Sequence, residues 1–171
     1  MHINFKIFRK LKKIMWKYYY TRKALKSLKE YDGLPHVNKR STFNKNTHLG
    51  SNCHFNGIDI LGRGKVRIGN NFHSGPDCMM ITENHNINGT ALPYDHSSVI
   101  KNIDIGDNVW VGCKVIILGG VKIGEGVVIQ AGSVVVSDIP ALSIAGGHPA
   151  KVFSKRDSVH YYALKNQNKF C

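Results

Sequence analysis

The sequence predicts an all-β domain, a parallel β-helix, with an N-terminal helix and a short C-terminal helix. Two patterns support this: six-residue blocks between Ile105 and Pro140 that each open on a branched aliphatic residue, and a basic amphipathic pattern over residues 3–31. An α-helix cannot keep a period of six on one face, whereas short strands joined by tight turns can. Such units bury their aliphatic residues by stacking on one another, with Gly or Asn at bends that need a positive φ.

The repeat extends towards the N-terminus with less regularity. Its openers step by six, with one slip at 62–65: Phe43, Leu49, Phe55, Leu61, Ile68, Ser74 and Met80. From about residue 84 to 102 no period can be laid down, so we expect a loop that projects from one corner of the rod. The predicted division is therefore a helix within 1–34, a β-helix over 35–150 and a tail over 151–171. In the tail, Asp157 is expected to cap a helix over 158–166.

The net charge of +13 is concentrated at the two ends of the chain. Residues 1–40 carry a net +10, residues 41–150 a net −1 and residues 151–171 a net +4. The basic helix over 3–31 has two compatible interpretations: it caps the rod and its exposed strand edge, or it makes peripheral contact with an anionic membrane. No nucleic-acid partner is expected, because the chain has no recognisable nucleic-acid-binding motif.

Several classes of protein are not expected. The chain has no apolar run of about 18 residues to span a membrane, and its start does not resemble a signal peptide. Its four cysteines, Cys53, Cys78, Cys113 and Cys171, are widely spaced, which does not favour a metal site or a disulfide framework. We therefore expect a cytoplasmic protein, with the inner membrane face as the place of any peripheral contact.

Four features together resemble the hexapeptide-repeat acyltransferases. They are the blocks, the histidine-bearing loop, the Asn108-Val-Trp110-Val-Gly112 pattern and the Gly147-His-Pro149-Ala-Lys151 ending. The nearest branch is that of the maltose, galactoside, nodulation-factor and capsule-type sugar O-acetyltransferases, over residues 43–156. The resemblance implies a left-handed β-helix, a homotrimer, and acetyl-CoA bound between neighbouring subunits. It also implies a sugar hydroxyl as the acceptor, which we expect on a surface polysaccharide or its precursor.

Transfer of an acetyl group to a hydroxyl needs a base, and histidine suits that role near neutral pH. His85 directly follows the Met80 block, where the resemblance places the catalytic histidine. The implied mechanism is direct transfer without an acyl-enzyme. His96, Asn56 and Asn84 are predicted to contact the acceptor. Glu83 and Asp95 are alternative partners for orienting an imidazole ring, and each is equally well explained as a solvated acid.

The resemblance also implies cofactor contacts. They are Trp110, Cys113, Ala131, Gly132, Ser137, Lys151 and Lys155. Ala131 and Gly132 would let the pantetheine arm approach the backbone, and the two lysines would meet the CoA phosphates, unless they form only a solvated basic face. Trp110 would flank the pantetheine channel or be an exposed aromatic in a subunit interface. Ser137 replaces a lysine that is frequent in relatives.

Two other functions stay open. The same base would serve N-acetylation of an amino sugar or a small xenobiotic. A non-catalytic scaffold is the second alternative, in a metal-binding form that uses His48, His54 and His73 on facing coils. We otherwise expect these three histidines to be solvated at outward corners, and we expect no metal.

Overall fold

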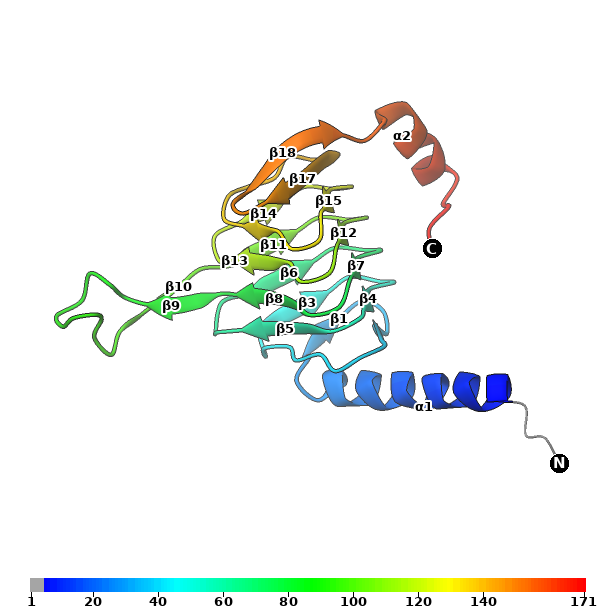
Figure 1. Ribbon diagram of the computed structural model, residues 1–171, viewed down its shortest axis with the longest axis horizontal. Helices are drawn as coiled ribbons and strands as arrows, with labels where there is room; N and C mark the ends of the chain where they lie inside the picture. Colours follow the sequence, from blue (N-terminus) through cyan, green and yellow to red (C-terminus); the bar gives the residue numbers. More distant parts are fainter. Residues whose placement is uncertain (1–4) are drawn as a thin grey trace.

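The computed structural model describes residues 5–171 as a rod of parallel β-strands with a helix near each end of the chain (Figure 1). Sheet A contains β1 (Glu30–Tyr31), β3 (Thr47–Leu49), β6 (Val66–Ile68), β11 (Ile103–Ile105) and β14 (Lys122–Ile123). Sheet B contains β2 (His36–Val37), β4 (His54–Phe55), β7 (His73–Ser74), β12 (Trp110–Val111), β15 (Val128–Ile129), β17 (Ser143–Gly147) and β18 (Ala150–Lys155). Sheet C contains β5 (Ile58–Leu61), β8 (Cys78–Ile81), β13 (Ile116–Leu118) and β16 (Val134–Val135).

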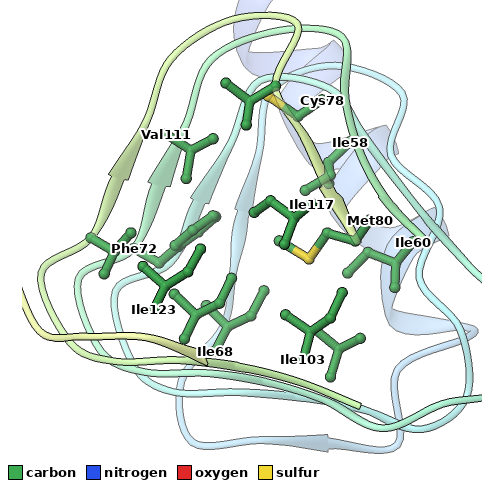
Figure 2. Packing of buried hydrophobic residues seen from close by; sticks show 14 of the residues in the cluster. Ile58, Ile60, Ile68, Phe72, Cys78, Met80, Ile103, Val111, Ile117 and Ile123 are labelled. Atoms are coloured by element: carbon green, nitrogen blue, oxygen red, sulfur yellow. The ribbon is translucent and has the colours of Figure 1, made fainter. Parts of the chain in front are cut away.

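The six-residue period is confirmed as an inward-facing period. The six block openers are each at most 3% exposed: Ile105, Val111, Ile117, Ile123, Ile129 and Val135. Figure 2 shows such side chains pointing into the interior between the three walls. Neighbouring coils pair in register, so that Ile105 stacks between Ile68 and Ile123. Each buried aliphatic contributes about 1.5–3 kcal/mol, so the stacked column is the main source of stability.

One residue predicted to open a block in the irregular part of the repeat, Leu61, does not face inward. In β5 the inward residues are Ile58 and Ile60, whereas Leu61 is 43% exposed on the outer face of sheet C. Ile60 pairs with Met80, and this register moves Leu61 to the opposite face of the strand. The spacing between the inward residues Phe55 and Ile60 is therefore five rather than six, so the repeat is already interrupted before the irregularity expected at 62–65.

The glycines that follow the openers serve close packing rather than a positive φ. A Cβ atom at Gly112 would lie 2.5 Å from the backbone nitrogen of Ala131 in the next coil. Positive φ values occur elsewhere in the corners, at residues that include Asn71, Asn108 and Gly132. The expectation that Gly and Asn occupy bends with φ > 0 is therefore correct for Asn71, Asn108 and Gly132, and it is wrong for the glycines that directly follow the openers, such as Gly112.

Helix α1 (Phe5–Leu25) is shorter than the helix predicted over 3–31. Residues 3 and 4 lie outside the described residues, and Glu30–Tyr31 form β1, which pairs with β3. The rod thus begins at Glu30 rather than at residue 35, because β1 pairs with β3, and Ala24 and Leu28 are buried in the same core. Figure 1 shows α1 lying across that end, with its N-terminal half extending beyond the coils. Within residues 5–171, no helix has the length and apolar character needed to cross a membrane.

The C-terminal segment packs on the rod. Residues 151–155, predicted as tail, belong to β18, which runs antiparallel to β17. Helix α2 (Ser158–Asn166) has the predicted bounds, and the Asp157 carboxylate accepts a hydrogen bond of 3.1 Å from the His160 backbone nitrogen.

A ladder of asparagine side chains leads to α2 along the corner between sheets A and B. The Asn52 amide donates to Asn71, and Asn71 donates to Asn108, each over 2.9 Å. Asn108 donates to the Tyr161 hydroxyl of α2 over 2.8 Å, and that hydroxyl donates to Glu125 over 2.7 Å. This chain of hydrogen bonds fixes α2 beside the coils that contain Asn108 and Glu125.

Candidate functional site

The expected loop is a β-ribbon. Strands β9 (Glu83–His85) and β10 (Ser98–Ile100) pair antiparallel, with His85 opposite Ser98. The ribbon leaves the rod at the corner between sheets C and A and projects far from the coils (Figure 1). His85 is exposed at the outer end of β9. A paired ribbon holds this side chain more firmly than a structureless loop would.

The His85 ring stacks on Tyr94, with ring centroids 3.7 Å apart and an interplanar angle of 8°. Stacking holds the plane of the imidazole and leaves the ring nitrogens, which lie in that plane, uncovered by Tyr94. Within residues 5–171, neither nitrogen has a hydrogen-bond partner. Sequence reasoning missed Tyr94, since its only signal was an aromatic residue inside a polar segment.

Neither proposed acid orients His85. The Glu83 carboxylate receives hydrogen bonds of 3.0 Å from the backbone and side chain of Arg63, and these, led by the guanidinium, lower the pKa of Glu83 to about 2. Asp95 accepts hydrogen bonds from the Ser97 hydroxyl and from the Thr90 and Ser97 backbone nitrogens, and these hold its pKa below the ordinary range. Glu83 ties the ribbon to the rod and Asp95 shapes its tip.

The predicted acceptor contacts divide into two groups. Asn84 and His96 are exposed on the same ribbon as His85. Asn56 lies at the corner between sheets B and C, where it accepts from Asn38 over 3.0 Å and donates to the Ser74 carbonyl over 2.8 Å. Its amide is therefore engaged in holding that corner together.

Three of the predicted cofactor residues lie together at the corner between sheets B and C. The Gly132 nitrogen donates to the Cys113 carbonyl over 2.8 Å, and Ala131 packs against Gly112. Gly132 has a φ of +72°, and a Cβ atom added there would meet nothing within 4 Å. The corner is thus an open ledge of backbone, as a close-lying ligand arm requires.

The other predicted cofactor residues are more dispersed. Lys151 pairs with Gly146 at the end of sheet B nearest the ledge, whereas Lys155 pairs with Ser143 at the opposite end of β18. Ser137 follows β16 and lies at the corner from which the ribbon projects. The structure therefore brings Lys151 towards the ledge and leaves Lys155 away from it.

Trp110 lies on the outer face of sheet B, 56% exposed. It lines a groove of about 560 Å³ between that face and the C-terminal segment. The opposite wall of the groove comes from Tyr161, Leu164 and Phe170. Trp110 is thus near the ledge in sequence but faces a different side of the rod.

The same sheet face carries a stack of three imidazoles, of which His54 and His73 were expected on facing coils and His36 was not. His36, in the first coil, stacks on His54, and His54 stacks on His73, with centroid distances of 4.3 and 4.4 Å. Burial, followed by the neighbouring His73 and His36, lowers the pKa of His54 to about 4. His48 lies on sheet A near Glu30 and Asp32, so it does not join this set. The described residues contain no group of three or more His, Cys, Asp or Glu arranged to hold a metal ion.

Cys53 and Cys78 are buried, and burial raises the pKa of each thiol, that of Cys53 to about 11. Both side chains therefore belong to the packed core of the rod.

Comparison with known proteins gives a consistent set of similarities. The family model described as "Bacterial transferase hexapeptide (six repeats)" matches residues 102–137. The galactoside O-acetyltransferase of Escherichia coli K12 is 35% identical over 132 residues, which is 71% of this chain and 61% of that protein. This chain covers only 52–61% of the length of three curated relatives that it matches.

Two solved structures are similar along most of the chain. A maltose O-acetyltransferase from Clostridium difficile 630 has a TM-score of 0.65 at 28% identity and covers 86% of this chain and 88% of its own. A hexapeptide-repeat acetyltransferase from Vibrio cholerae O1 biovar eltor, complexed with acetyl coenzyme A, has a TM-score of 0.60 at 30% identity, over 68% and 64% of the two chains. These similarities confirm the predicted fold class, a left-handed parallel β-helix with an N-terminal and a C-terminal helix.

Proposed function

We propose that this chain, which is similar to hexapeptide-repeat transferases and to galactoside and maltose O-acetyltransferases, is an acetyl-CoA-dependent O-acetyltransferase acting on a sugar hydroxyl. The observation that carries the proposal is the exposed imidazole of His85, displayed on a paired ribbon with neither ring nitrogen hydrogen-bonded to any of residues 5–171. A solved relative complexed with acetyl coenzyme A supports the choice of acyl donor.

His85 is the proposed general base. Its imidazole takes the proton of the acceptor hydroxyl as the hydroxyl oxygen attacks the thioester carbonyl, and the imidazolium gives that proton to the departing thiolate of CoA as the C–S bond breaks. Base assistance of this kind is worth about 10²–10⁴ in rate, and placing both substrates together supplies much of the rest. Stacking on Tyr94 keeps the ring plane fixed, which lowers the cost of aligning it with the acceptor.

The open ledge at Cys113, Ala131 and Gly132 is the proposed resting place of the pantetheine arm, with Lys151 near a phosphate. A ligand arm can approach the backbone there because Gly132 presents no side chain. The ledge lies at the corner between sheets B and C, where the strands of sheet C begin. The ribbon lies at the corner between sheets C and A, where those strands end, so one copy of the chain does not place His85 beside its own ledge.

The outer face of sheet C suggests how a complete site forms. Its outward residues are almost all apolar: Leu61, Met79, Ile81, Ile116, Leu118, Val134 and Val136. We propose that this face lies at the centre of a homotrimer, which sets the ribbon corner of one subunit against the ledge corner of the next. The site then contains His85 from one copy and the ledge from its neighbour.

The acceptor proposed is a sugar of a surface polysaccharide or its precursor, modified in the cytoplasm. The exposed ribbon suits a large acceptor, since Asn84 and His96 have no covering element among residues 5–171.

The test is release of CoA from acetyl-CoA with a panel of sugars, amino sugars and small amines. Wild-type chain should turn over sugar hydroxyls, and His85→Ala should lower kcat by about 10²–10⁴ with little change in KM for acetyl-CoA. His160→Ala, an exposed histidine on α2, is the matched control and should keep full activity. Unchanged turnover in His85→Ala would remove the assignment of the base, and activity on amines alone would favour N-acetylation.

A further inference from the structure

Helix α1 turns an apolar face away from its own domain. Seven large apolar or aromatic side chains of its N-terminal part are each 50–62% exposed: Ile7, Phe8, Leu11, Ile14, Met15, Tyr18 and Tyr19. We refer to these seven residues as the α1 stripe. A helix on a globular domain normally buries such a face against the core, so the α1 stripe is unusual.

The helix is attached to the rod by a different face. Ala24 and Leu28, at 1% and 5% exposure, pack on the rod end, and Tyr20 is partly buried beside them. With about 100° of rotation per residue, Ile7, Leu11, Ile14 and Tyr18 fall on one side of α1 and Ala24 on another, and Leu28 follows the end of the helix. The α1 stripe is therefore free of the rod because of its angular position.

The charge on α1 indicates what would cover the stripe. The helix contains eight Lys or Arg and no acidic residue, and Arg9, Lys10, Lys12 and Lys13 are exposed around the stripe. An apolar stripe flanked by cations, with aromatic rings among it, has the composition of a helix that lies in the interface of an anionic bilayer. A basic helix would be a poor partner for the basic helix of a second copy.

We propose that α1 is a docking surface for an anionic lipid membrane. The helix lies flat, with the α1 stripe among the acyl chains and its lysines and arginines among the head groups. Because α1 lies across the rod end, this places the rod upright on the membrane, with the His85 ribbon extending sideways above it (Figure 1). Where the site acts as proposed above, docking would hold it near a lipid-linked glycan acceptor. The docking itself does not depend on that activity.

The experiment is co-sedimentation of the full chain with vesicles of phosphatidylcholine doped with phosphatidylglycerol, and with vesicles of pure phosphatidylcholine. The wild-type chain should bind the anionic vesicles and not the neutral ones, and binding should fall as salt is raised. Leu11→Glu/Ile14→Glu should weaken binding by tenfold or more, and Lys12→Glu should weaken it by about fivefold or more. The matched controls are Val159→Glu on α2 and Lys122→Glu on sheet A, which should bind as the wild type does.

Three results would overturn the proposal. The first is equal sedimentation of wild type and Leu11→Glu/Ile14→Glu. The second is a Leu11→Glu/Ile14→Glu variant that changes its mass in solution, since the stripe would then contact a second copy. The third is binding to duplex DNA in place of vesicles. CoA release with a soluble sugar, measured on the same variants, separates docking from catalysis and should be unaffected.

Discussion

At the scale of single residues, the proposed chemistry depends on side chains held by contacts other than those usual for a catalytic histidine. His85 is positioned by the face of Tyr94, while the nearby acids Glu83 and Asp95 are engaged in shaping the ribbon. Gly132 contributes by having no side chain. These two positions lie on different corners, so substitutions at each test different halves of the site.

Gly132→Asn should weaken CoA binding without unfolding the rod. Asn tolerates a left-handed backbone, and the equivalent corner positions of earlier coils, Asp77 and Lys114, already have φ values of +59° and +55°. The added side chain would fill the ledge, so we expect KM for acetyl-CoA to rise about tenfold or more. Steady-state kinetics with circular dichroism as a folding check would measure this. Asp77→Asn, at the same corner position, is the control, and an unchanged KM would show that the ledge does not carry the donor.

Stability should fall as the pH drops below about 6.5, because of the stacked imidazoles. The pKa of His54 is lowered from 6.5 to about 4 by burial, His73 and His36, with a further contribution from Lys17 of α1. Between these values the unfolded chain binds a proton that the folded His54 does not, so the free energy of unfolding decreases, and below about 4 the penalty stays constant.

His54→Gln should flatten this dependence, since Gln can still donate to Asn52 as His54 does over 2.9 Å. Thermal unfolding across the mildly acidic range would show a smaller loss of Tm in the variant than in wild type. The control His160→Gln should keep the wild-type slope. Identical slopes in all three proteins would contradict the role of the stack.

At the scale of elements, the coils and helix α2 are joined at the corner between sheets A and B. The asparagine ladder ends where the next coil has Gly126, and the Tyr161 ring occupies the space that another asparagine would take. Arg156 lies 5.0 Å from the centre of that ring and Lys165 pairs with Glu125, so α2 is fixed by several contacts around one tyrosine.

Gly126→Ala should loosen α2. A Cβ atom there would lie 2.9 Å from the Tyr161 ring and 2.7 Å from Leu142, and φ is +69°. The matched control is Gly132→Ala, with a φ of +72° and open space, which should cost only the backbone strain of about 1–2 kcal/mol. Chemical denaturation should find Gly126→Ala the less stable of the two, and limited proteolysis should cleave it within α2. Equal stability of the two variants would mean that the Tyr161 ring moves aside without a cost in free energy.

The repeat made the coils predictable, because a period of six suits stacked short strands and not an α-helix, and every opener from Ile105 to Val135 is buried. Local capping chemistry likewise predicted α2 from Asp157. The end of α1 and the position of Leu61 were missed, because both are set by contacts with other coils. His85 was proposed from its place after the Met80 block and from the family resemblance, and its role stays a prediction. Tyr94 was missed because its stacking on His85 depends on how the ribbon folds. The histidine stack was predicted in part, since His54 and His73 were expected on facing coils and His36 was not.

At the scale of the whole molecule, the three faces of the rod differ in their outward residues. Sheet A presents the ionisable side chains His48, Arg67, Asp104 and Lys122, typical of a solvated face. Sheet B carries the histidines and Trp110 and is partly covered by the C-terminal segment. Sheet C is apolar, with Val136 48% exposed. A face of this kind on an otherwise polar rod favours burial between copies.

Ile116→Glu, on the outer face of sheet C, should therefore convert a trimer into monomers. A carboxylate repeated three times around the axis would have to be buried without a partner, at a cost of several kcal/mol. Light scattering coupled to size exclusion would give the mass, and Arg67→Glu on sheet A is the control that should stay trimeric. Loss of CoA release in step with loss of the trimer would agree with a site shared between subunits, whereas a monomeric Ile116→Glu with full activity would place the whole site within one copy. A wild-type chain that is monomeric at all concentrations would refute the interface itself.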